Sequence, residues 1–328
     1  MKNVIFGLLM LLGFVVLNRC STEVDLYADF KDITIVFGVL DYTDDTSWIK
    51  ITKAYSGPGN ALVMAQNPDS SNYPYKLDVK LTGTKQGDNL APIIFDTLTI
   101  NNKKAGDSIF YYPDQLMYFA VGELDVDANY TLTVMNKDEE TTSETQLIPK
   151  FSITYPKNTI NFTTNNNTID WNSGKYGKRY EVYYTFNYQE LLPGTTDTSW
   201  NSMNWKVGDY QLSQSTDGGE KMHQLYIGDA FYSKLNADLE HITNVQRWAG
   251  PLQVYVSAGS QVLQNYISIN DATGSLLTEV PTYSNIKNGT GIFAARHTSL
   301  KTSRISNKSL EVLVEDYDLG FKYPTENK

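Results

Sequence analysis

Short runs of alternating apolar and polar residues recur along the chain, separated by clusters of turn-forming residues. Alternation with a period of two is typical of a strand with one buried and one solvated face. The clearest runs are residues 48–54 (WIKITKA), 75–81 (YKLDVKL) and 252–257 (LQVYVS). Other expected strands cover residues 33–40, 93–100, 108–112, 116–121, 129–134, 159–163, 168–171, 179–188 and 210–215. The pattern predicts a mainly β protein.

One segment has a helical period instead. Phe231, Leu235 and Leu239 recur every four residues, which places them on one face of a helix. Asp229 precedes them and is a good N-cap residue. We therefore expect one clear helix over residues 230–241, whereas residues 262–269 are expected to continue a β or mixed region.

Turn signals and prolines divide the chain near residue 150. Residues 31–150 are expected to form an immunoglobulin- or fibronectin-like β-sandwich, in which Leu124 and Tyr130 have the spacing of a corner between two strands. The polar stretch 136–144 is expected to turn a hairpin. Residues 151–328 are expected to form an α+β, mostly antiparallel domain, with a loop over residues 192–208.

The first twenty residues have the layout of a secretory signal peptide. A basic start is followed by fourteen uncharged residues, 4–17, and then by Cys20, the only cysteine. A cysteine at this place resembles a bacterial lipoprotein cleavage site. We expect residues 1–19 to be removed, Cys20 to carry the lipid, and residues 20–30 to form a tether. The alternatives are cleavage elsewhere or an uncleaved anchor.

Charge and cysteine content narrow the possible partners. The formal charge is -10 and becomes -12 when Lys2 and Arg19 leave with the signal peptide. Such a chain is not expected to bind nucleic acid or an anionic bilayer electrostatically, so the lipid must hold it on the membrane. The acidic residues 23, 25 and 29 resemble surface-export signals, or they simply solvate the tether. A single cysteine leaves no internal disulfide, so the fold depends on burial.

A glycine-containing motif, YSNIKNGTGIF, covers residues 283–293. Asn288 and Gly289 are typical of a tight turn, Gly291 permits close backbone approach, and Phe293 begins a buried strand. No Lys-Ser/Thr pair or following helix indicates a phosphate loop. The physical interpretation is therefore a structural turn.

The same motif is similar to the C-terminal signature of a family of Bacteroidota outer-membrane lipoproteins, which is known only as a domain of unknown function. The matching positions are Tyr283, Asn285, Gly289, Gly291 and Phe293, and Ala294 replaces the final glycine. The resemblance implies a lipid-anchored, surface-exposed outer-membrane protein with an immunoglobulin-like first half. It also implies a TonB-dependent outer-membrane receptor as partner in nutrient import.

The chain offers little recognisable catalytic chemistry. His223, His241 and His297 are far apart, without metal-ligand spacing, and no G-x-S-x-G motif occurs. No metal, cofactor or catalytic residue is expected. Two acidic turns, one with Asp44 and Asp45 and one with Asp125 and Asp127, could hold Ca²⁺ or could simply be solvated.

Aromatic residues are the best candidates for ligand contact, because flat rings bury apolar ligand surface at low entropic cost. Trp171 lies in an expected strand and is assigned to the core. Trp200 and Trp205 lie in the expected polar loop, where burial is less assured, so they are the predicted glycan- or peptide-binding residues. Trp248, Tyr183, Tyr184 and Tyr188 are further candidates.

These observations favour a non-enzymatic outer-membrane lipoprotein that serves as an accessory or substrate-capture subunit of a TonB-dependent import system. Two alternatives remain open. A surface glycan or peptide hydrolase would need opposed carboxylates or a metal in a cleft. A structural or adhesive surface protein would present flat aromatic faces without a pocket.

Overall fold

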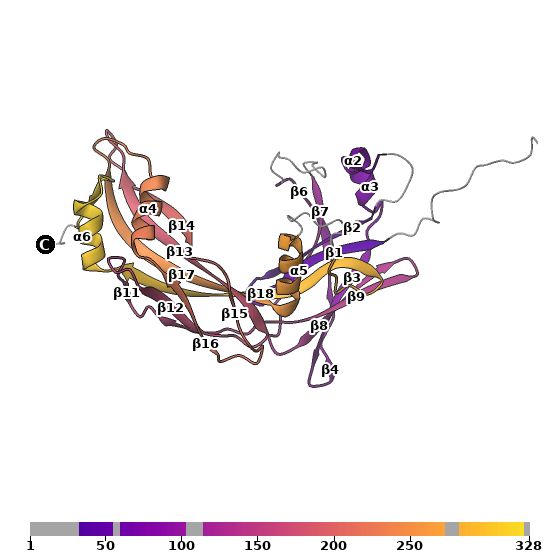
Figure 1. Ribbon diagram of the computed structural model, residues 1–328. Helices are drawn as coiled ribbons and strands as arrows, with labels where there is room; N and C mark the ends of the chain where they lie inside the picture. Colours follow the sequence, from indigo (N-terminus) through magenta and orange to yellow (C-terminus); the bar gives the residue numbers. More distant parts are fainter. Residues whose placement is uncertain (1–32, 55–59, 103–113, 273–281, 325–328) are drawn as a thin grey trace, which may run out of the picture.

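The computed structural model describes residues 33–54, 60–102, 114–272 and 282–324. The expected signal peptide, Cys20, the tether and the expected strand 108–112 lie outside these residues. Within them the protein is mainly β, as predicted. The chain forms two lobes joined by long strands (Figure 1).

The N-terminal lobe contains strands of two sheets. One sheet has β1 (Thr34–Leu40), β2 (Thr46–Lys53), β6 (Asp96–Ile100) and β7 (Gln115–Val121). The other has β3 (Asp78–Lys85), β4 (Asp88–Asn89), β5 (Ile93–Ile94), β8 (Asn129–Asn136) and β9 (Glu139–Gln146). Two short helices, α2 (Ala61–Met64) and α3 (Pro68–Ser71), follow β2. The strand alternation of the sequence buries Ile49, Ile51, Val79, Leu81 and Leu132 in the shared core.

The C-terminal lobe is built around β13 (Gly177–Leu191) and β17 (Gln246–Ser260), which pair along almost their whole lengths. Its other strands are β10 (Ile153–Tyr155), β11 (Thr159–Ile160), β12 (Asn167–Asn172), β14 (Ser199–Lys206), β15 (Gln211–Leu212), β16 (Lys221–Tyr226) and β19 (Phe321–Lys322). The helices are α4 (Asp229–Asp238), α5 (Gln261–Ala272) and α6 (Asn307–Glu315). Phe231 of α4 stacks on Phe162 at 3.9 Å between ring centroids and meets Phe186 of β13 edge-on at 5.3 Å, which joins helix and sheet.

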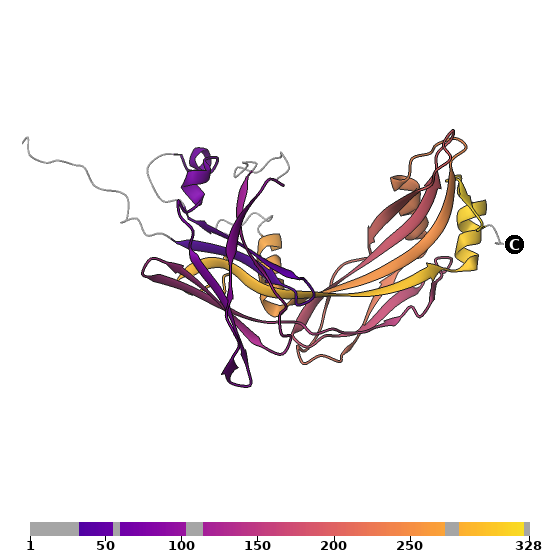
Figure 2. The ribbon, with the colours of Figure 1, turned by 180° about the vertical axis from the view of Figure 1, so that it is seen from behind.

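One strand belongs to both lobes. β18 (Gly289–Ile305) pairs in parallel with β1 through residues 289–295, then antiparallel with β17 through residues 296–303. The largest sheet therefore runs in the order β14-β13-β17-β18-β1-β2-β7-β6. Figure 2 shows β18 passing from one lobe to the other. The division into residues 31–150 and 151–328 stays a prediction, and this sheet runs across it.

The helices differ from the sequence prediction in three ways. Gly228, not Asp229, is the N-cap of α4, and Asp229 is the first helical residue. Residues 262–269, expected as β or mixed, belong to helix α5, and α2, α3 and α6 are further helices. The pattern of α5 is ambiguous because paired apolar residues such as Val262 and Leu263 suit either structure, and in the fold Leu263 packs against Gly259 of β17.

The expected loop over residues 192–208 is correct for residues 192–198 and 207–208 and wrong for the stretch between them. Residues 199–206 form β14, the strand at one edge of the large sheet. Its polar residues Ser202 and Asn204 face solvent, and Met203 between them is buried. The hairpin expected around residues 136–144 is present, with β8 paired to β9 and Lys137 in the left-handed region at φ 55°.

Candidate functional site

The two faces of β13 have different environments. Tyr184 and Phe186 point into the core of the C-terminal lobe and are fully buried. Thr185, Asn187 and Gln189 alternate with them and are only half-buried. We call the face that carries these three residues the outer face of the sheet.

Trp200 lies on the outer face at the edge of the sheet, and its side chain is 60% exposed. It is paired with Gln189 of β13, which is paired with Trp248 of β17, so the two tryptophans flank one glutamine. The Trp200 ring lies directly against Gly250, because a Cβ added there would be 2.6 Å from Cζ3 of the indole. A glycine is thus required for the ring to rest on the β17 backbone.

A groove begins at the same glycine. The pairing of β17 with β18 ends at Leu252 and Ser303. Beyond this point β17 pairs with β19 through residues 247–248, and β18 pairs with β11 through residues 304–305. The gap between the separating strands is a cavity of about 780 Å³. Its lining includes Thr159, Ala249, Gly250, Pro251, Thr302, Ser303, Arg304, Ile305, Asn307, Leu310 and Pro324. We call it the fork groove. Gly250 both lines the groove and supports Trp200, so the ring lies beside the groove.

Hydrogen bonds fix the polar side chains of the outer face. Asn187 donates to the Pro251 carbonyl at 3.0 Å, and the Tyr255 hydroxyl donates to Gln253 Oε1 at 3.0 Å. Thr185 donates to Asn204 at 2.7 Å. Side chains held in this way lose little entropy when a ligand binds, which favours recognition.

An ionic cluster lies farther along the same face. Glu181 accepts hydrogen bonds from Tyr183 and Arg179 and forms an ion pair with Lys206. Burial raises the pKa of Glu181, but these three partners outweigh it and leave the pKa below its usual value. Burial and the bond to Glu181 raise the pKa of Tyr183 to about 12. The carboxylate is therefore charged and the phenol neutral at pH 7.

The structure separates the two predicted ligand residues. Trp200 and Trp205 are five positions apart on one strand and so lie on opposite faces of β14. Trp205 faces the core and stacks on Tyr184 at 5.7 Å between ring centroids. Trp171 is a core residue, as predicted, with 1% exposure. Of the two predicted ligand residues, Trp200 is the exposed one, at 60%.

The motif at residues 283–293 is a turn that leads into β18. It contacts β1 on one side and the β9 side chains of Thr141 and Ser143 on the other. The Asn285 carboxamide accepts from the Phe293 amide at 2.9 Å and donates to the Phe293 carbonyl at 2.7 Å. Gly291, at φ 110°, approaches β1 so closely that an added Cβ would be 2.1 Å from the Val36 carbonyl oxygen. A Cβ at Gly289 would lie 2.6 Å from the Thr34 carbonyl oxygen, Phe293 is fully buried, and Tyr283 is half-buried.

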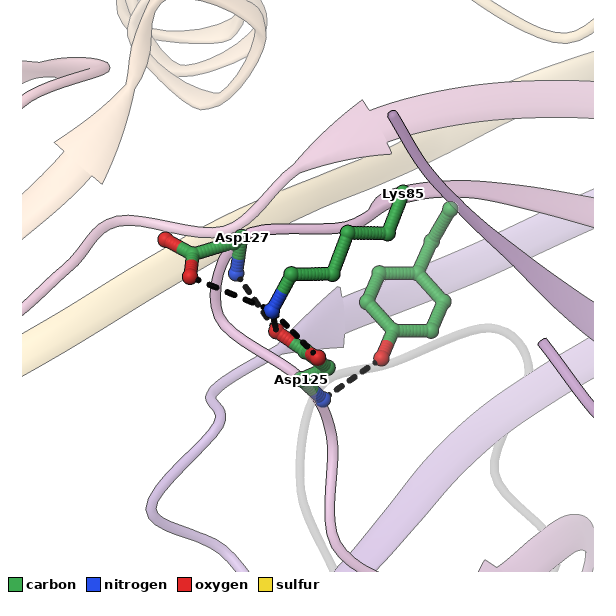
Figure 3. Close-up of polar contacts among 4 residues, drawn as sticks. Lys85, Asp125 and Asp127 are labelled. Atoms are coloured by element: carbon green, nitrogen blue, oxygen red, sulfur yellow. Dashed lines mark hydrogen bonds and ion pairs between the residues drawn. The ribbon is translucent and has the colours of Figure 1, made fainter. Parts of the chain in front are cut away.

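The acidic turns have protein partners. Lys85 reaches Asp125 at 2.9 Å and Asp127 at 3.3 Å, as Figure 3 shows. The Asp125 amide also donates to the Tyr130 hydroxyl at 2.7 Å, the bond expected of a tyrosine at a strand corner. Asp44 pairs with Arg296 at 3.6 Å and Asp45 accepts from Thr46. Within the described residues, no three His, Cys, Asp or Glu side chains group in a way that could hold a metal ion.

His297 is the one buried histidine in the described part of the chain. Its Nδ1 lies 3.4 Å from the Asp41 carboxylate, and its ring stacks on Tyr42 and meets Phe151 edge-on. Its Nε2 has no hydrogen-bond partner. Because both side chains are at most 5% exposed, the pair is part of the core. His223 and His241 are exposed.

The fork groove was missed at the level of sequence, although one signal pointed to it. Gly250-Pro251 interrupts the run of residues 246–260, and such a pair indicates a bulge or a break in strand pairing. The pairing with β18 indeed begins only at Leu252, directly after it. Trp248 was a candidate, but its neighbour on the outer face, Gln189, cannot be identified without the register.

Comparisons with known proteins add no identification. No family model and no curated protein matches the chain. Among solved structures, the crystal structure of CBD12 from CALX1.2 aligns at 7% identity over 81% of this chain and 100% of that chain, with a TM-score of 0.14. The BSP domain of a biofilm associated protein aligns at 11% identity over 84% of this chain and 60% of that chain, also with a TM-score of 0.14. Neither likeness bears on fold or function. In the described ranges, no helix has the length and apolar character needed to cross a membrane.

Proposed function

We propose that this protein is a lipid-anchored outer-membrane protein that captures a glycan at the outer face of its C-terminal lobe, as a non-enzymatic subunit of a TonB-dependent import system. The observation that carries the binding part of the proposal is Trp200, 60% exposed and seated on Gly250 at the edge of the fork groove. An indole face at the edge of a groove is suited to stack on the apolar face of a sugar ring.

The groove lining favours a glycan over a peptide. Thr302 and Asn307 are exposed there, beside apolar Pro251 and Leu310, and Arg304 is its charged residue. Hydroxyl and amide groups match sugar hydroxyls as both donors and acceptors. A peptide would instead be expected to add along the free edge of β14 rather than to enter the groove.

Binding is tested with soluble polysaccharides in affinity electrophoresis. Replacing Trp200 with alanine is expected to weaken retardation at least about tenfold, because a central aromatic contact supplies a large share of binding energy. The matched control is Trp48→Ala, which removes a 36% exposed tryptophan from β2 in the other lobe. Equal retardation of the wild-type protein and Trp200→Ala would remove the binding proposal.

The anchor and the partner are tested separately. Wild-type protein is expected to incorporate labelled palmitate and to remain in the membrane fraction, and Cys20→Ala is expected to do neither. Two or more acyl chains suffice for stable anchoring.

Affinity purification from mild detergent is expected to recover a TonB-dependent receptor, since tethering raises the local concentration of the protein beside it. Recovery of this chain alone contradicts the import role.

An immunoglobulin-like first half is part of the same proposal. It is supported by the hydrogen bond from the Asp125 amide to the Tyr130 hydroxyl and by the burial of Leu124 beside it. The predicted boundary near residue 150 belongs to this proposal as a division between two lobes that share β18, and it does not require the lobes to unfold independently.

A further inference from the structure

A second cavity lies where the two lobes meet, at the opposite end of β13 from Trp200. Its volume is about 350 Å³. The N-terminal lobe contributes Asn129, Glu144, Thr145 and Gln146, and the C-terminal lobe and α5 contribute Tyr176, Thr216, Ser260, Gln261 and Val262. We call it the junction cavity. Tyr176 and the Trp200 partner Gln189 are thirteen positions apart, about 40 Å along an extended strand, so the two sites are separate.

Tyr176 has an unusual backbone for a bulky residue. Its φ is 66°, in the left-handed region where glycine or asparagine is the ordinary occupant. Two hydrogen bonds hold it there, from the Tyr176 amide to the Thr216 carbonyl at 2.6 Å and from the Gly177 amide to the Gly174 carbonyl at 3.0 Å. Backbone strain of this kind is concentrated at functional sites, and here it fixes a ring that lines a cavity.

Several polar groups in the lining are available for a ligand. Within the described residues, the Glu144 carboxylate and the Tyr176 hydroxyl make no hydrogen bond or ion pair. Gln146 donates to Asn129 at 2.7 Å, which leaves the Asn129 NH₂ group and the Gln146 carbonyl oxygen with unused capacity. A carboxylate, two amides and an aromatic ring around one small space form a convergent polar site.

The charges favour a neutral ligand over a cation. A carboxylate beside a tyrosine could also bind an ammonium group. Lys175, however, already places its Nζ 4.8 Å from the Tyr176 ring centroid, where it would repel a second cation. A neutral polyol needs no net charge and uses the carboxylate as a bidentate acceptor for two hydroxyls.

We infer that the junction cavity is a binding site for a neutral mono- or disaccharide, with Tyr176 stacking on the sugar ring and Glu144 accepting from its hydroxyls. A volume of about 350 Å³ is at the small end of ligand pockets and suits a ligand of this size. Since both lobes line the cavity, a bound sugar contacts both. The inference rests on these residues alone and not on the function proposed for the fork groove.

Saturation-transfer NMR with a panel of neutral hexoses and their disaccharides tests the site on the full mature chain. At least one sugar is expected to bind wild-type protein. Glu144→Gln and Tyr176→Asn are each expected to weaken the binding of that sugar at least about tenfold, a loss typical of a group central to recognition. Asparagine tolerates the left-handed backbone, so Tyr176→Asn removes the ring and keeps the turn.

Two controls make the result specific. Glu140→Gln neutralises another carboxylate of β9 that does not line the cavity and is expected to leave binding unchanged. Trp200→Ala is also expected to bind the sugar as wild-type does, which separates this site from the fork groove. The inference is overturned if no sugar of the panel binds, if tetramethylammonium binds instead, or if Glu144→Gln and Tyr176→Asn bind as wild-type does.

Discussion

Arg247 is among the largest side chains enclosed by the fold, and each of its three guanidinium nitrogens donates a hydrogen bond. It pairs with Glu190 at 2.7 Å and donates to the carbonyls of Leu319 at 2.7 Å and Glu240 at 3.0 Å. These bonds join β17 and β13 to the chain segments before and after them. A buried charge is tolerated only with such partners, because an unpaired one carries a large desolvation penalty.

Replacing Arg247 with alanine is expected to lower the free energy of unfolding by about 3 kcal/mol, since Glu190, only 13% exposed, would lose its partner. The control is Lys234→Ala, which breaks the solvent-exposed pair with Asp238 and should cost less than about 1 kcal/mol. Urea denaturation measures both. Similar losses in the two variants would show that burial does not control the energy of these pairs.

The Asp41–His297 pair predicts a pH dependence of stability. Burial raises the pKa of Asp41, but hydrogen bonds from His297 and Thr43 outweigh it and hold the pKa below its usual value. A carboxyl with a depressed pKa in the folded state stabilises the fold above its unfolded pKa of about 3.9, and this contribution is lost as pH falls through the lower folded value. We therefore expect the free energy of unfolding to fall less in Asp41→Asn than in the wild-type protein when the pH is lowered from about 5 to about 3.

Urea midpoints measured at intervals between about pH 5 and pH 3, around the unfolded pKa, test this expectation. Asp45→Asn is the control, because Asp45 lies on the same turn and bonds only the exposed Thr46 hydroxyl. It should keep the full acid sensitivity. An Asp41→Asn protein with the wild-type pH profile would mean that the buried pair does not contribute to acid unfolding.

At the scale of elements, the pairing of β1 with β18 depends on glycines. Gly291 has φ 110° and no room for a Cβ beside the Val36 carbonyl, and Gly38 faces the ring of Phe293 across the two strands. A larger residue at Gly291 would push the two strands apart, and one at Gly38 would displace the Phe293 ring.

Gly291→Ala is therefore expected to destabilise the protein more than backbone strain alone, which costs about 1–3 kcal/mol at a positive φ. Gly87→Ala isolates that strain, because Gly87 has φ 94° and nothing within 4 Å of an added Cβ. Thermal unfolding compares the two variants. If both lower the melting temperature equally, the close approach to Val36 is not a constraint on the sheet.

The elements also show what the sequence could predict. Strands such as β2 and β3 follow from alternation, because one face of each is buried and the other is solvated. β14 was missed because an edge strand with exposed Ser202 and Asn204 has a polar composition, and its pairing with β13 alone defines it. The exposure of Trp200 and the burial of Trp205 follow from this pairing, so the candidate site could be predicted only in part.

At the scale of the whole molecule, one sheet and one set of buried side chains extend through both lobes. β18 joins the lobes from within, because its first half completes the sheet of β1 and its second half completes that of β17. Neither lobe can lose its share of β18 without exposing an unpaired strand edge.

This sharing predicts that the two lobes unfold together. In Trp48→Phe the remaining tryptophans, Trp171, Trp200, Trp205 and Trp248, all lie in the C-terminal lobe, so fluorescence reports that lobe, whereas far-ultraviolet circular dichroism reports strands of both. In guanidinium chloride the two signals should give coincident transitions, because coincidence of independent probes marks a two-state process. Two separated transitions would mean instead that β18 leaves one lobe while the other stays folded, and that residues 31–150 and 151–328 are independent domains.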